Sequence, residues 1–223
     1  PIITSAANHL AAGSGTFNVN IPTGTDMFVM CTLGFDAGKA IDDLNAITIG
    51  GITMSQGTSN AEGSTGRYNW TSMHYRISPP TGATVAFSAT FNVHDDTSYV
   101  DEPTFIYFVI QGAALAGYTD SDTTDLSSTT SLSNQLDTAI GDICIRIVAV
   151  NDDVTVTVGD DQITAGTASA SNTFTHNASH QIATGVSTTM GGSLSEAESG
   201  PTAALAFAKG TASIPIDMTS SGG

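Results

Sequence analysis

Hydrophobic and polar residues alternate with a period of two along much of the chain, which is the pattern of strands with one face in a core. Clear examples are Thr16–Ile21 and Val85–Phe91. Met27–Phe35 is apolar almost throughout and predicts a strand that is buried on both faces. Gly50 and Gly51 separate two alternating apolar runs and predict a two-residue hairpin turn. The strand is therefore the dominant expected element.

Helix signals are scarce, and the best helix candidate is the short segment Ser131–Ile140. Two segments rich in small polar residues predict exposed loops, Gln56–Gly66 and Tyr118–Asn134. Together these patterns predict an all-β fold, an antiparallel β-sandwich of jelly-roll type with roughly ten strands and very little helix.

The 223 residues are expected to form a single domain, because β-sandwiches of this length commonly do. An extended N-terminal arm is expected over about 1–14, and a loosely held C-terminal tail over about 213–223. Cys31 and Cys144 each lie in an apolar run, which favours buried thiols, although pairing between them stays open.

The charge balance is strongly acidic, with 21 Asp and Glu against five Lys and Arg, and a net charge of −16. Such a surface repels phosphate groups, so nucleic acid and anionic membranes are not expected as partners. No apolar run is long enough for a transmembrane helix, and the first residues show no signal-peptide pattern. The expectation is synthesis in a cytoplasm without a signal peptide.

No catalytic constellation stands out, and the chain is not expected to be an enzyme. A Gly-x-Ser-x-Gly nucleophile motif is missing from the sequence. The acidic pairs Asp101-Glu102 and Glu196/Glu198 could serve a β-sandwich glycoside hydrolase, but their polar settings favour a solvated surface. His176 and His180 would lie roughly 13 Å apart on a strand, which is too far for one zinc ion.

Two groups of residues are candidates for binding. No cofactor is expected apart from calcium, for which the candidate ligands are the carboxylates of Asp120, Asp122 and Asp125. The second group surrounds the single tryptophan and could form either a protein contact or a sugar-stacking site: Tyr68, Trp70, His74 and Arg76. Burial or a subunit contact is favoured for Trp70, because one aromatic ring is a thin platform for a sugar.

The order of elements from Ala46 to Tyr118 resembles β-sandwich modules of tailed-bacteriophage virion proteins, particularly capsid decoration and tail-associated proteins. The elements that carry this resemblance follow one another along about a third of the chain: the hairpin Ile49–Met54, the strand Trp70–Tyr75, the turn Ser78–Gly82, the strand Val85–Phe91, and an apolar strand that ends at Gly112.

The resemblance implies a non-enzymatic virion protein, made in the host cytoplasm, that decorates or cements a capsid through symmetric protein contacts. Its expected partners are the major capsid protein or other virion proteins, and further copies of itself. The alternatives are a carbohydrate-binding module of a tail or adhesin, with a glycan as partner, and, in last place, the glycoside hydrolase.

Overall fold

The computed structural model describes residues 1–9, 15–36, 44–64, 67–91, 100–151, 153–159, 162–169 and 174–211. Every regular element in them is a β-strand, and each strand pair is antiparallel. The predicted all-β antiparallel sandwich is therefore confirmed. These residues form fifteen strands, more than expected. They contain no helix long and apolar enough to cross a membrane.

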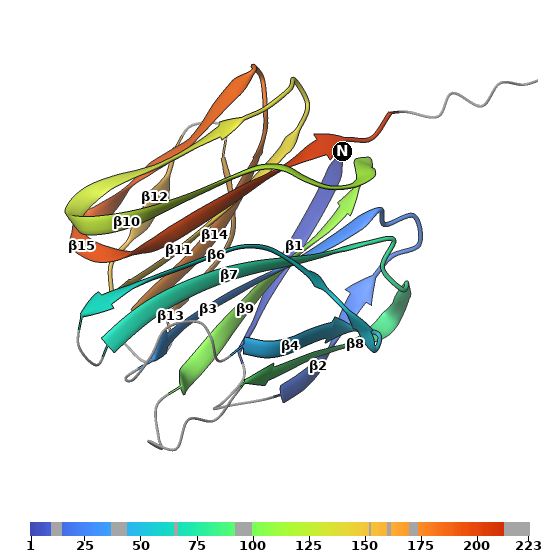
Figure 1. Ribbon diagram of the computed structural model, residues 1–223, viewed down its shortest axis with the longest axis horizontal. Helices are drawn as coiled ribbons and strands as arrows, with labels where there is room; N and C mark the ends of the chain where they lie inside the picture. Colours follow the sequence, from blue (N-terminus) through green and yellow to red (C-terminus); the bar gives the residue numbers. More distant parts are fainter. Residues whose placement is uncertain are drawn as a thin grey trace, which may run out of the picture.

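Three sheets stack in layers, one more than in a two-sheet sandwich (Figure 1). The middle layer, called here the central sheet, has the strand order β1-β9-β3-β7-β6. Its strands are β1 Ile2–His9, β9 Val100–Gln111, β3 Met27–Asp36, β7 Arg67–Ile77 and β6 Ser55–Ser64.

Strand β3 explains why the central sheet lies in the middle. Its odd-numbered residues, from Met27 to Leu33, pack toward one neighbouring sheet, whereas Phe28 and Met30 pack toward the other. An amphipathic strand can pack against a neighbouring sheet on one face only. A strand that is apolar on both faces can pack against a sheet on each face. The predicted burial on both faces is therefore confirmed for residues 27–34.

The small sheet covers one face of the central sheet and has the order β2-β8-β4-β5. Its strands are β2 Gly15–Ile21, β8 Gly82–Phe91, β4 Leu44–Ile49 and β5 Ile52–Thr53. Gly50 and Gly51, with φ angles of 57° and 76°, make the predicted hairpin turn between β4 and β5. The apolar face of this sheet, which includes Val19 and Phe87, packs on Phe28 and Phe105.

The ribbon sheet covers the opposite face and has the order β10-β15-β11-β14-β13, with β12 paired to β15. Its strands are β10 Ala113–Asp137, β15 Ser187–Lys209, β11 Ile143–Asn151, β14 Phe174–Ile182, β13 Ile163–Ser169 and β12 Val156–Val158. Ile143, Ile145 and Ile147 of β11 pack with Phe108 in the main core.

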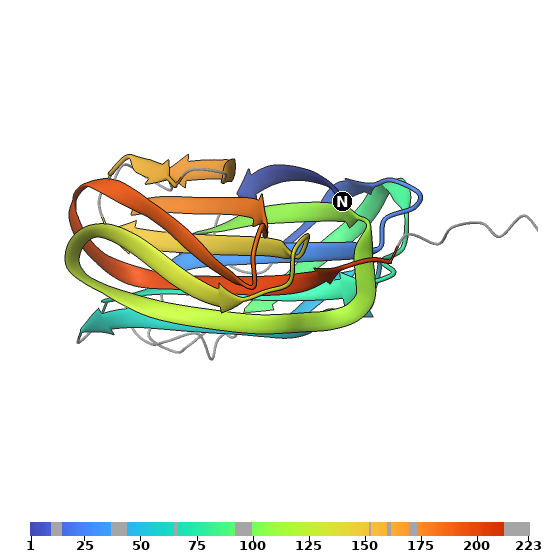
Figure 2. The ribbon, with the colours of Figure 1, turned by 90° about the horizontal axis from the view of Figure 1, so that it is seen from above.

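Strands β10 and β15 form a long two-stranded ribbon that folds over the outer side of β11 (Figures 1 and 2). Irregularities in the register between Leu126 and Ser131 mark the bend. Beyond the bend, Leu132 and Leu194 pack on Val148, and Met190 packs in a cluster with Cys144. The ribbon therefore acts as a further layer over the sheet to which it belongs.

Three local predictions were wrong. Gln56–Gly66 is not an exposed loop, because residues 55–64 form β6, and Tyr118–Asn134 belongs to β10. Ser131–Ile140 is not helical. Leu132 and Leu136 are four residues apart, a spacing that also fits one face of a helix. In the structure Asn134 between them is buried as well, so every second residue here faces the interior, as in a strand.

The predicted N-terminal arm is also corrected. Residues Ile2–His9 form β1, which pairs with β9 along its whole length from Ile2 opposite Gln111 to His9 opposite Thr104. Residues 10–14 and the predicted C-terminal tail, 213–223, lie outside the described residues.

Candidate interaction surface

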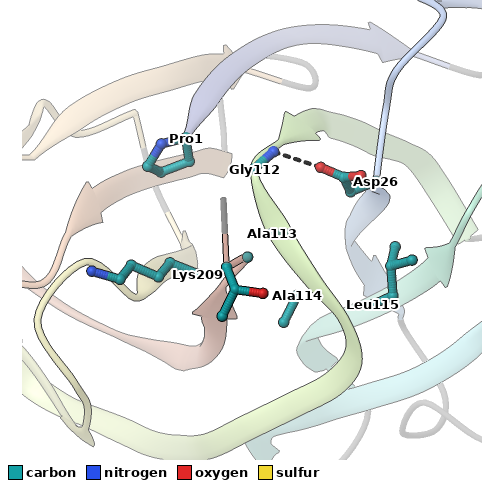
Figure 3. Close-up of a pocket in the computed structure, with 9 residues that line it drawn as sticks. Pro1, Asp26, Gly112, Ala113, Ala114, Leu115 and Lys209 are labelled. Carbon is teal, nitrogen blue, oxygen red and sulfur yellow. Dashed lines mark hydrogen bonds between the residues drawn. The ribbon is translucent and has the colours of Figure 1, made fainter. Parts of the chain in front are cut away.

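A pocket of about 980 Å³ opens where the first residues of the central sheet meet the ends of the ribbon (Figure 3). It is lined by Pro1, Asp26, Gly112, Ala113, Ala114, Leu115, Lys209, Gly210 and Thr211. Leu115 and Lys209 lie on opposite sides of the view. The pocket therefore combines an apolar wall with a cation, and we call it the Lys209 pocket.

Local hydrogen bonds hold the walls of the Lys209 pocket in place. The backbone N–H of Gly112 donates to Oδ2 of Asp26 over 2.5 Å, and Gly112 has a φ angle of 84°. The backbone N–H of Gly210 donates to the carbonyl oxygen of Gly112 over 2.7 Å. The connection between β9 and β10 is thus tied both to the start of β3 and to the end of β15.

One exposed apolar side chain, Leu115, lines the Lys209 pocket, and two more are chain neighbours of residues at or beside it. Leu115 is 63% exposed, Ile2 follows Pro1 and is 65% exposed, and Ile140 is 64% exposed. Ile140 precedes Gly141, where a Cβ would lie 2.6 Å from Cδ of Lys209. Among the described side chains, Lys209 is the only exposed lysine or arginine. Apolar groups that cluster on a surface commonly mark an interaction site.

The sequence alone did not reveal this surface. Leu115, Ile140 and Lys209 are separated by long stretches of chain, and each is unremarkable in its own segment. The only sequence signal for an exposed apolar site was Leu115, which follows Gly112 and stands among small residues. Its position near Lys209 depends on the pairing of β10 with β15, which the sequence does not show.

The structure does not assemble the predicted calcium site. Asp120 and Asp122 lie on a strand, and Asp120 Oδ2 accepts the backbone N–H of Asp137 over 2.7 Å. Asp122 Oδ2 accepts the backbone N–H of Gln135 over 3.0 Å. The carboxylate of Asp125 accepts Nδ2 of Asn60 over 2.9 Å. Within the described part of the chain, no three acidic, histidine or cysteine side chains form a metal-binding group.

The described side chains of the group proposed for sugar stacking are buried or half-buried. Trp70 is 5% exposed and packs in the core between the central and small sheets, so the burial favoured for it is what the structure shows. His74 is buried on the same face of β7, with its Nδ1 3.2 Å from Oγ of Ser72. Arg76 is half-buried, and the side chain of Tyr68 lies outside the description. No stacking platform is formed by Trp70.

The histidine pair and the acidic pairs noted in the sequence do not form a common site among the described side chains. His176 lies within 2.8 Å of Thr104, and His180 makes an edge-on ring contact with Phe108, so both pack in the interior and do not face a common ion. Glu196 is exposed on β15. The side chains of Asp101 and Glu102 lie outside the description.

Cys31 and Cys144 are buried free thiols, as favoured from the sequence. Burial raises the pKa of the Cys31 thiol well above its ordinary range. It also raises the pKa of Cys144, to about 12, so neither cysteine is a reactive thiolate at neutral pH.

Comparison with protein-family models, with curated proteins and with solved structures finds no match to this chain.

Proposed function

We propose that this chain is a non-enzymatic structural protein of a bacteriophage virion, which decorates or cements the capsid. The resemblance of the segment Ala46–Tyr118 to virion β-sandwich modules motivates the class of protein. The observation that carries the proposal is the exposed apolar rim of the Lys209 pocket. The chain has a net charge of −16, yet an exposed leucine, Leu115, lines this pocket, and two exposed isoleucines are chain neighbours of Pro1, which also lines it, and of Gly141, which lies beside Lys209.

Burial of such side chains favours attachment to a partner. Covering Ile2, Leu115 and Ile140 would contribute about 1–2 kcal/mol each, before the entropic cost of association is subtracted. Lys209 can pair with a carboxylate of the partner at the rim of the contact. The pocket therefore fits an apolar side chain of the partner that is flanked by an acidic residue, and the proposed partner is the major capsid protein.

The test is binding of the purified protein to empty shells assembled from the major capsid protein proposed as its partner. The wild type should co-sediment with shells and saturate at a fixed number of copies per capsid subunit. Leu115→Asp and Ile140→Asp should each weaken binding at least tenfold, because each places a charge in an apolar contact.

Ile163→Asp is the matched control, because Ile163 is also an exposed isoleucine, at 62%, but lies on β13, at the opposite edge of the ribbon sheet from β10, which carries Leu115. It should bind like the wild type. Equal loss of binding in all three variants, or no binding of the wild type, would contradict the proposal.

A further inference from the structure

Within the described residues, strand β2 is an open edge of the small sheet. It pairs with β8 on one side, and no other described strand pairs with it. An open edge presents unpaired backbone N–H and C=O groups, and natural proteins protect such edges with charges, prolines or very short strands. β2 has seven residues, and none of them is charged or proline. The usual protection is therefore missing.

The other sheet edges in the described part of the chain are protected. β5, at the opposite edge of the small sheet, has only two residues. β10 carries four aspartates, and β6 carries a glutamate and lies against both ribbon strands. β1 and β13, which are edges of two different sheets, lie against each other. Among the described edges, β2 is thus the one that combines length and lack of charge with no facing edge strand.

The whole small sheet is free of charge. None of the residues in β2, β8, β4 and β5 is Asp, Glu, Lys or Arg, although the chain carries a net charge of −16. Two copies of such an acidic protein repel each other, and the repulsion is smallest where the approaching surfaces are neutral. The charge distribution therefore favours a second copy as the partner at this edge.

Side chains at the edge are suited to a neighbouring strand. Phe17 is only half-buried, although its ring is tilted against two core rings, with centroid distances of 4.8 Å to Phe87 and 5.6 Å to Phe105. On the outer face, Thr16, Asn18 and Asn20 are exposed, and Oγ1 of Thr16 donates to Oγ of Ser88 over 3.2 Å. A further strand would cover Phe17 and extend this polar face.

We propose that two copies of this chain pair through β2 in an antiparallel arrangement about a twofold axis at Asn18. Asn18 is the middle residue of β2, so this register pairs the strands over their full length. It places Asn18 opposite Asn18 of the second copy, and Phe17 opposite Val19 of the second copy. The two small sheets then form one continuous sheet, and the aromatic and β-branched pairs lie on the core side.

The contact area of one strand pair is below that of a stable dimer interface, so the dimer is weak and concentration-dependent in solution. Salt strengthens it, because screening at ~0.5 M shortens the repulsion between the acidic copies to about 4 Å. This salt response distinguishes the contact from one that depends on ion pairs, which salt would weaken.

The experiment is sedimentation equilibrium over a range of protein and salt concentrations. Asn18→Asp places two carboxylates roughly 5 Å apart across the axis and should weaken dimerisation about tenfold or more at low salt. Ala86→Asp is the matched control. Ala86 is the β8 neighbour of Asn18 on the same exposed face, and its two copies would lie roughly 14 Å apart.

A charge-reversal pair completes the test. Asn18→Lys alone should also be mainly monomeric, whereas an equimolar mixture with Asn18→Asp should recover the dimer. A wild type that stays monomeric at high concentration and high salt would overturn the proposal. So would a dimer that Asn18→Asp leaves unchanged. Either result concerns self-association alone and leaves attachment through the Lys209 pocket to be judged by shell binding.

Discussion

The indole ring of Trp70 lies against Gly34, its register partner on β3, so closely that a Cβ at position 34 would come within 2.5 Å of Cζ2 of the ring. This contact fixes the only tryptophan of the chain in the core between the central and small sheets. The glycine is therefore required by close approach, since any side chain there must displace a buried ring.

Gly34→Ala should destabilise the protein by about 1–3 kcal/mol, because the added methyl group overpacks a buried site. Chemical denaturation followed by Trp70 fluorescence measures this directly. Gly185→Ala is the control, since the nearest atoms to a Cβ there are 3.7 Å away, and it should change stability little. Equal stability of both variants would mean that the Trp70 ring moves aside without cost.

Arg146 is a fully buried cation under the folded ribbon. The effect of a substitution on stability should depend more on how well the new side chain fills the space than on its charge. Its Nη1 donates to the carbonyl oxygens of Met190 and Gly191 over 2.6 and 2.9 Å, whereas Nε and Nη2 have no partner. Burial lowers the pKa of its guanidinium to about 10. A charge held in this way costs stability.

Arg146→Met should therefore raise the free energy of unfolding by about 1 kcal/mol or more, since it fills similar space without a charge. Arg146→Ala should lower it by about 2–4 kcal/mol through the cavity that it leaves. Thermal unfolding of the two variants decides between these effects. A methionine variant less stable than the wild type would show that the guanidinium has a stabilising partner.

Acid should weaken the fold through its buried histidines. Burial lowers the pKa of His74 from 6.5 to about 4, and burial also lowers the pKa of His180. Between pH 6.5 and 4 the unfolded chain binds a proton at His74 that the folded chain does not, so stability falls as the pH falls. The loss from His74 is at most about 3 kcal/mol. His74→Gln should flatten the stability profile in this window, and an unchanged slope would assign the acid sensitivity to other groups.

Calcium should leave the melting temperature unchanged. Asp120 and Asp122 accept backbone N–H groups of the returning half of β10, and Asp125 is bonded to Asn60. Melting curves with millimolar calcium and with a chelator should coincide. If calcium raised the melting temperature and Asp122→Asn abolished that rise, the calcium site predicted from the sequence would be supported.

The sequence predicted the strands that carry a clear apolar pattern and missed those that do not. Met27–Phe35 was recognisable because burial on both faces demands an unbroken apolar run. Residues 55–64, and the half of β15 that contains Glu196, are strands because of pairing with distant segments, and their own side chains are mostly small and polar. Hydrogen bonding between such segments leaves no periodic signal.

The candidate surface was harder to predict for a related reason. Leu115 and Lys209 are brought together by the pairing of β10 with β15, whose residues Ala113 and Lys209 are register partners. Local patterns instead drew attention to Trp70 and to the aspartates of residues 120–125. Trp70 packs inside the protein, and Asp120 and Asp122 accept backbone hydrogen bonds. In the structure, Trp70 and these aspartates thus have contacts that stabilise the fold.

The most direct test of the proposed function is electron cryomicroscopy of virus particles from cells that express this chain, to ask whether the particles carry it. The account predicts density for the layered fold at symmetric positions on the shell, with the Lys209 pocket and Leu115 against the capsid protein. Particles that lack the chain would contradict the account, and so would particles that hold it with Leu115 and Ile140 facing solvent.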